Sequence, residues 1–168
     1  RDKSPHAFMR EALVAQTRLR EDRSGLILAA LASEAAGLSS RTGYAHPLLE
    51  QYFAARVDRT SPAPPRLQPL AQIAYSAQAF ENLEQIYQRL DADDPTPAAN
   101  SVSLILASIR DLGAQPLLGR PAEDGLRERV ISRGRTGYVA LYRHLELDAC
   151  VLVLANRHRY AAGYPRSD

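Results

Sequence analysis

The last third of the sequence concentrates residues that could bind phosphate or transfer a proton. The planar guanidinium of arginine offers paired donors that suit phosphates and carboxylates. The candidate target-binding residues are Arg127, Arg129, Arg143, Arg157 and Arg159. His158 and Tyr160 alternate with the last two arginines, and they are the candidates for acid–base catalysis. These residues are consistent with two interpretations. The first is a cationic surface that binds RNA or an acidic patch of another protein, and the second is a solvated face of a protein that uses arginine in place of lysine.

Other common chemistries have no motif here. The sequence has no phosphate-binding loop, no Cys/His set with metal spacing and no serine–histidine–acid arrangement. The remaining histidines, His6, His46 and His144, are scattered, and we expect structural or neutral roles for them. We therefore expect neither a cofactor nor a metal site.

Bulk properties limit the possible classes of protein. The chain has 168 residues, enough for one domain or two small ones, and its net charge of +2 gives no overall polyanion-binding character. Cys150 is the single cysteine and lies in an apolar run, which predicts a buried thiol and a reducing, cytoplasmic setting. No stretch has the length of a membrane span or the pattern of a signal peptide. Because the chain starts at Arg1 without methionine, we expect that its native N-terminus is missing or was processed.

The second half predicts elements that would position the arginines. A strand over residues 70–76 precedes a helix that Ser76 caps, and apolar residues recur along that helix at helical spacing. A further helix begins at Thr96–Pro97 and ends at Gly113. Strands follow at 127–132, 137–143 and 150–155; the second alternates like a half-buried strand, and the third is apolar enough for the sheet centre. This order predicts an α+β fold, with a helical hairpin on one face of an antiparallel sheet.

The first half predicts two amphipathic helices and a linker. One helix starts at Ser4–Pro5, with Gly25 as a candidate kink and Gly37 as its end. A polar turn then precedes a shorter helix. Each helix has one apolar side without a partner, so we expect both to pack on something else. The proline-rich segment 58–69 is the best candidate for a domain boundary.

The second half resembles a known family. The run "LGRPAEDGLRERVISRGRTGYVALYRHLELDACVLVLANRHRYAAGY" resembles the C-terminal half of bacterial plasmid-stabilisation toxins, the ParE/RelE superfamily. The run "IAYSAQAFENLEQIYQRL" is similar to the first strand and helix of the same toxins. The resemblance covers residues 70–164 with every element in order, and it implies a toxin domain of a type II toxin–antitoxin system.

The first half resembles the partner of such toxins. "DKSPHAFMREALVAQT" is similar to the second helix of a ribbon-helix-helix antitoxin of the ParD/CopG type, and "RTGYAHPLLEQYFAARVDR" to its toxin-binding arm. The resemblance implies an antitoxin segment (1–58), a linker (59–69) and a toxin domain (70–168) in one chain. The implied antitoxin–toxin interface comprises Leu26, Leu31, Leu48, Leu49, Tyr52 and Phe53. The DNA-reading ribbon is absent before Arg1, so we expect weak binding to operator DNA, and we also expect a homo-oligomer.

The family implies two alternative targets. ParE-like toxins poison DNA gyrase, whereas RelE-like toxins cleave mRNA in the ribosome, which here would use Arg127, Arg129 and Arg143 as phosphate clamps and His158 or Tyr160 for proton transfer. We favour gyrase, because the strand from Gly137 lacks the basic residue that ribonuclease members often carry there. Two further hypotheses stay open: a non-toxic degenerate fusion with a regulatory or oligomerisation role, and a general RNA-binding domain.

Overall fold

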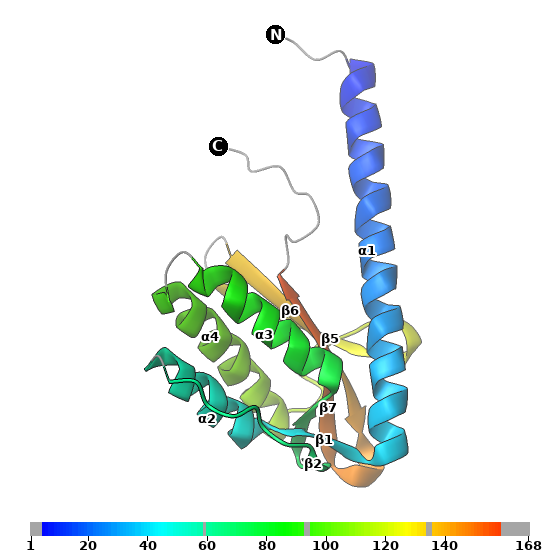
Figure 1. Cartoon of the computed structure of the whole chain (residues 1–168). Coiled ribbons are helices and arrows are strands. Elements are labelled where there is room, and N and C mark those ends of the chain that lie inside the picture. The colour runs from blue at the N-terminus through cyan, green and yellow to red at the C-terminus, as the bar shows by residue number, and fades with distance from the viewer. Residues whose placement is uncertain (1–4, 59, 93–94, 134–135, 159–168) are drawn as a thin grey trace.

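The computed structural model describes residues 5–58, 60–92, 95–133 and 136–158. These residues form three layers: helices α2, α3 and α4, a mixed sheet, and the long helix α1 on the opposite face (Figure 1). The helices are α1 (Pro5–Ser40), α2 (His46–Val57), α3 (Ala77–Asp91) and α4 (Pro95–Ala114). The strands are β1 (Thr42–Ala45), β2 (Gln68–Pro69), β3 (Ile73–Tyr75), β4 (Arg120–Pro121), β5 (Arg127–Arg133), β6 (Thr136–Leu145) and β7 (Cys150–His158). Short 3-10 turns occupy Glu123–Gly125 and Glu146–Asp148.

The sheet has the strand order β2-β1-β3-β7-β6-β5-β4, which places the apolar strand β7 at its centre as predicted. Neighbouring strands are antiparallel except for β3 and β7, which run parallel with Ala74 opposite Leu152. The expected α+β fold, with the helical hairpin α3–α4 on one face of the sheet, is confirmed. The exception to an antiparallel sheet arises because the hairpin and the β4–β6 meander separate β3 from β7 along the chain, so no tight turn dictates their direction.

Two predictions about the hairpin are confirmed in detail. Ser76 caps α3, because its side-chain oxygen accepts a hydrogen bond from the amide of Ala79 at 3.2 Å. The expected apolar side of α4 lies in the main core with the inner side of α3. The residues of α4 in that core include Val102, Ile105, Leu106, Ile109 and Leu112.

The expectation that β6 is half-buried is wrong. Tyr138, Ala140 and Tyr142 belong to the core under α2–α4, and Leu141 belongs to a second core that Ile27 of α1 completes. Both faces of β6 are therefore buried, because α1 covers the side that the alternation assigned to solvent. An alternating pattern of this kind cannot distinguish a solvated face from one that a distant helix covers.

The first helix also differs from expectation. It runs without a break through Gly25 and past Gly37 to Ser40. The next residue, Arg41, has a φ of 51°, the left-handed conformation that often follows the last residue of a helix. The segment expected as a polar turn instead contributes β1. Similarly, the linker contains the short strand β2, and α4 starts at Pro95 rather than at Pro97.

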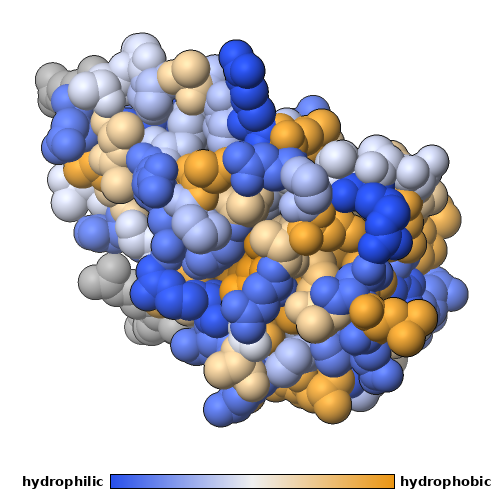
Figure 2. Space-filling model, turned by 90° about the horizontal axis from the view of Figure 1, so that it is seen from below, coloured by the Kyte–Doolittle hydropathy of each residue, from blue (hydrophilic) through white to orange (hydrophobic). Residues whose placement is uncertain are grey.

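The surface is mixed in character. Figure 2 shows hydrophilic and hydrophobic residues interleaved over the face seen from below. The N-terminal half of α1 extends past the sheet (Figure 1) and exposes Phe8, Met9, Leu13 and Val14. Within the described residues, no helix combines the length and the apolar character needed to cross a bilayer.

Candidate functional site: the arginines of the sheet and the segment that covers them

The candidate target-binding arginines lie on two different faces of the sheet. Arg127 and Arg129 pair with Tyr142 and Ala140, so they share the face under α4, as their spacing predicted. Arg143 pairs with Leu152, which belongs to the core on the α1 side. The structure therefore does not bring these three arginines together as one cluster.

Arg127 and Arg129 are half-buried, and some of their hydrogen-bond donors have no partner among the described residues. The Nη2 atom of Arg127 donates to the backbone oxygen of Leu117 at 3.0 Å. The Nε atoms of both arginines are buried without a hydrogen-bond partner among the described residues. These two side chains thus retain donors that could serve a ligand or partner on the α4 side of the sheet.

Arg143 is engaged by α1. Its guanidinium meets the carboxylate of Glu34 through two contacts, Nε to Oε1 and Nη2 to Oε2, the second at 3.0 Å. Its Nη2 atom also donates to the backbone oxygen of Asp124 at 3.0 Å. The side chains of Arg143 and Glu34 are only 24% and 9% exposed. The fork-shaped pair satisfies Arg143, which leaves it unavailable to another anion while α1 is in place.

A second ion-pair network joins α1 to the sheet. The Nη1 atom of Arg23 lies 3.0 Å from Oε2 of Glu128, which is buried, and Arg120 contacts the other oxygen of the same carboxylate. Arg23 also reaches Glu123 at 3.5 Å. A buried carboxylate without a partner is costly. The contact between Arg23 and Glu128 therefore adds a specific polar interaction to the apolar packing of α1.

The docking stripe of α1 consists of Arg23, Ile27, Ala30, Glu34 and Gly37, at alternating spacings of four and three residues. Ile27 and Ala30 are buried in the second core, and the two charged members make the ion pairs just described. Sequence reasoning found an apolar side on this helix but missed Arg23 and Glu34. The signal was present, because the same helical spacing continues through both charged residues.

Two expected interface residues of α1, Leu26 and Leu31, are half-buried against this second core. The expected interface residues of α2 lie against the helical hairpin α3–α4. Leu49 and Phe53 are buried in the main core, while Leu48 and Tyr52 are half-buried. The ring of Phe53 lies 5.9 Å from that of Tyr87 and 6.4 Å from that of Phe80, measured between centroids. The two N-terminal helices thus pack on the part of the chain after Leu70.

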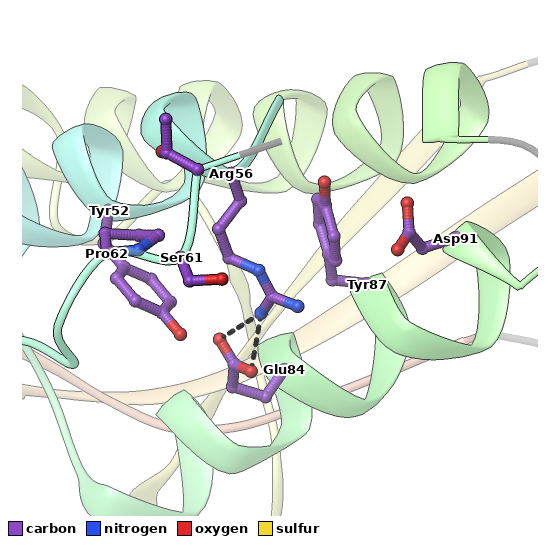
Figure 3. Close-up of a pocket in the computed structure, with 8 residues that line it drawn as sticks. Tyr52, Arg56, Ser61, Pro62, Glu84, Tyr87 and Asp91 are labelled. Atoms are coloured by element: carbon purple, nitrogen blue, oxygen red, sulfur yellow. Dashed lines mark hydrogen bonds and ion pairs between the residues drawn. The ribbon is translucent and has the colours of Figure 1, made fainter. Parts of the chain in front are cut away.

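A polar pair reinforces this contact at the end of α2. Arg56 donates from Nη1 to both carboxylate oxygens of Glu84, at 2.8 and 2.6 Å, and its Cζ lies 4.3 Å from the centroid of Tyr87 (Figure 3). Burial acts to lower the pKa of Arg56, but Glu84 outweighs it and raises that pKa above its ordinary value. Arg56, Glu84 and Tyr87 line a hollow of about 550 Å³, and the linker residues Ser61 and Pro62 line it as well.

The start of α2 is held by a buried network that sequence reasoning did not foresee. The Nδ1 atom of His46 lies 2.7 Å from the hydroxyl of Tyr75 in β3. Its Nε2 atom lies 3.2 Å from a carboxylate oxygen of Glu50, and Glu50 in turn pairs with Arg110 of α4. Burial, opposed by Glu50, lowers the pKa of His46 below its ordinary value of 6.5. The structural role expected for His46 is what this arrangement supports.

The N-terminal segment also extends the sheet. In the antiparallel pairing of β1 with β3, Tyr44 lies opposite Tyr75 and Ala45 opposite Ala74. Gly43 permits the close approach, because a Cβ there would lie 3.0 Å from the backbone oxygen of Tyr75. The edge of β3 is thereby covered, as an added strand covers a sheet edge in peptide recognition.

The candidate acid–base residues lie at the end of β7. His158 makes an edge-on contact with Tyr138, with ring centroids 5.1 Å apart. Burial, followed by the charge of Arg89, lowers the pKa of His158 below its ordinary value. Arg157 is half-buried on the opposite face of the strand. Arg159 and Tyr160 lie outside the described residues.

Comparisons with known proteins fit this architecture. Residues 73–160, slightly more than half of the chain, match the model of the ParE toxin of type II toxin–antitoxin systems, parDE. The chain therefore belongs to the ParE toxin family, and the matched part is the toxin domain of a toxin–antitoxin system. The match does not extend to residues 1–72. The comparison with curated proteins gives no match.

Among solved structures, the chain is similar to one in the toxin–antitoxin complex RelBE2 from Mycobacterium tuberculosis. The identity is 24%, the alignment covers 54% of this chain and 99% of that one, and the TM-score is 0.35.

Proposed function

We propose that residues 1–58 act as an antitoxin segment that neutralises a ParE-family toxin domain, residues 70–168, in the same chain. Residues 59–69 would be the linker. The observation that supports this most directly is the pairing of Glu34 with Arg143, together with the packing of Ile27 and Ala30 of α1 on one face of the sheet. On the other face, Phe53 and Leu49 of α2 complete the core of the helical hairpin.

A tethered inhibitor benefits from its linker. The short connection from Asp58 to Pro69 keeps the local concentration of the segment high, so moderate contacts suffice to hold it. The network around His46 and the pair between Arg56 and Glu84 add directional contacts to the apolar ones. We expect the intact chain to be non-toxic even if it is cut within the linker.

Expression in a bacterial host tests the inhibitory role. Residues 70–168 alone should arrest growth, the full chain should not, and residues 1–58 supplied in trans should restore growth. Normal growth while soluble 70–168 accumulates would refute the proposal and favour a degenerate, regulatory fusion.

A test in the intact chain avoids truncation. Ile27→Arg places a charge in the second core and should release toxicity, whereas Leu28→Arg, at a neighbouring position that is 68% exposed, should not. Equal toxicity of the two variants would refute the idea that docking of α1 is inhibitory.

For the toxin's target, we propose DNA gyrase. The candidate phosphate clamps Arg127 and Arg129 lie under α4 and Arg143 lies under α1, which supports a binding surface more than a compact hydrolytic centre. The purified 70–168 fragment should inhibit gyrase on plasmid DNA. Codon-specific cleavage on programmed ribosomes, lost in His158→Ala, would instead establish the alternative, a RelE-type mRNA endonuclease.

The setting and assembly follow from this proposal. Both candidate targets are cytoplasmic in bacteria, so we place the protein there, with plasmid or genome stabilisation as its role. A homo-oligomer could form through the exposed apolar residues of α1, such as Phe8 and Leu13.

A further inference from the structure

A hollow of about 430 Å³ lies where α1, α3 and the end of β7 meet. Its basic lining residues are Arg89, Arg157 and His158, and no carboxylate is among the described residues that line it. The side chains of Arg89 and Arg157 make neither an ion pair nor a hydrogen bond within the described part of the chain. By contrast, Arg143, Arg56 and Arg120 each have a carboxylate partner.

Arg89 and Arg157 therefore bring two positive charges to this hollow, and no carboxylate among the described residues that line it neutralises them. The charge of Arg89 adds to burial in lowering the pKa of His158, as expected when cationic groups face one another. A concave, partly desolvated wall of one sign strengthens the field on an incoming ion of the other sign. The geometry favours an anionic ligand.

Two buried polar atoms of the lining have no hydrogen-bond partner among the described residues. Asn156 is only 2% exposed, its Nδ2 donates to the backbone oxygen of Ala79 at 3.3 Å, and its Oδ1 has no partner among the described residues. The buried Nε atom of Arg157 is likewise unpaired. Leaving such groups unsatisfied costs stability, and a ligand that carries both donors and acceptors would offset that cost.

The rest of the lining is suited to a flat, partly apolar group. Leu26, Ile86 and Leu90 supply aliphatic walls and Tyr138 supplies an aromatic ring. The Oδ1 atom of Asn82 already accepts from the backbone amide of Asn156 at 3.0 Å, whereas the exposed carboxamide of Gln85 can pair with the donor and acceptor edge of a nucleobase. The volume is within the range of small-molecule sites.

We propose that this hollow binds a nucleotide, with its phosphoryl group between Arg89 and Arg157 and its base along the apolar wall beside the carboxamide of Gln85. The ligand would be either a free nucleotide or one nucleotide of a single-stranded RNA. This inference rests neither on gyrase as the target nor on inhibition by the N-terminal segment. An RNA ligand would favour the alternative mRNA endonuclease, whose candidate catalytic residue His158 lines the same hollow.

Binding to the intact chain tests the inference. AMP, CMP, inorganic phosphate and a tetraribonucleotide are titrated by calorimetry and by NMR at constant salt. The nucleotides should bind more tightly than inorganic phosphate and should shift the resonances of Tyr138 and His158. Tighter binding of the tetranucleotide would identify RNA as the source, and equal affinity would identify the free nucleotide.

Two matched pairs of variants locate the site. Arg89→Gln should weaken nucleotide binding about tenfold or more through loss of a charge-assisted contact, whereas Arg20→Gln, an exposed arginine of α1, should change it less than about twofold. Gln85→Glu adds a negative charge to the lining and should weaken binding severalfold. Gln88→Glu makes the same change on the same helix outside the hollow, and it should not.

Three results would overturn the assignment: no binding of any nucleotide at millimolar concentration, equal affinity for inorganic phosphate and AMP, or equal losses within each pair of variants. All four substitutions lie on helix surfaces, and unchanged amide spectra of the free variants would establish that they fold. A failed growth assay for the toxin would leave this test unaffected, so the two proposals are refuted separately.

Discussion

The ion pair between Glu34 and Arg143 allows a quantitative test of how α1 is held on the sheet. The perturbation is a double-mutant cycle of Glu34→Gln, Arg143→Gln and the double variant. Glutamine has nearly the same size as glutamate and is shorter than arginine. Both substitutions remove a charge. The cycle isolates the pairwise term from these individual effects.

The magnitude follows from burial and geometry. Breaking a fully buried pair costs about 3–5 kcal/mol, because one charge stays buried without a partner. Here the side chain of Arg143 is 24% exposed and keeps its bond to the backbone oxygen of Asp124, so water and that carbonyl reduce the loss. We expect Glu34→Gln to lower the free energy of unfolding by about 2–3 kcal/mol and the coupling energy to be about 1.5–2.5 kcal/mol.

The assay is urea unfolding of the intact chain, with hydrogen exchange of α1 amides as a local readout. Exchange should rise in residues near Glu34 without a comparable rise in α4. A coupling energy below about 0.5 kcal/mol, the value of an exposed pair, would refute the argument that this contact secures α1. Unchanged exchange in α1 would contradict it independently.

Three further outcomes are expected. Phe53→Ala should cost about 3–4 kcal/mol of unfolding free energy, whereas Val57→Ala at the exposed last residue of α2 should cost less than about 1 kcal/mol; equal losses in urea unfolding would contradict the packing of α2. Gly119→Ala should destabilise the chain by at least about 2 kcal/mol in the same assay, because its Cβ would lie 2.7 Å from the ring and hydroxyl of buried Tyr142; wild-type stability would contradict this geometry. The pKa of His46 is lowered in the folded state, so its contribution to stability is complete above pH 6.5 and is lost as the pH falls through the folded value. A His46→Gln variant should lose that part of the pH dependence in thermal unfolding from pH 7.5 to 5, and an unchanged pH profile would refute the assignment.

Local sequence patterns predicted the second half well. The cap at Ser76, the apolar side of α4 and the central position of β7 all follow from patterns within one element, and the family match starts at Ile73. Residues whose structure depends on distant partners were harder to predict. The strand β1 has four residues and forms by pairing with β2 and β3, so nothing within "TGYA" distinguishes it from a turn.

The candidate site was predicted in its residue types but not in its arrangement. The periodicity of β5 placed Arg127 and Arg129 on one face, yet no local pattern could place Arg143 under a helix that lies 109 residues away in sequence. The same holds for Glu128, whose partner Arg23 is 105 residues away. Contacts of this kind depend on how α1 crosses the sheet, which the sequence of either element alone does not determine.

The central position of β7 has a consequence for the order in which the protein matures during translation. This strand is the last described element to leave the ribosome, and until it arrives β3 and β6 have no common neighbour, so the sheet cannot close. By then α1, β1 and α2 have already been synthesised and can fold onto the nascent sheet as it forms. A molecule built in this order never presents a completed sheet without its covering helices alongside.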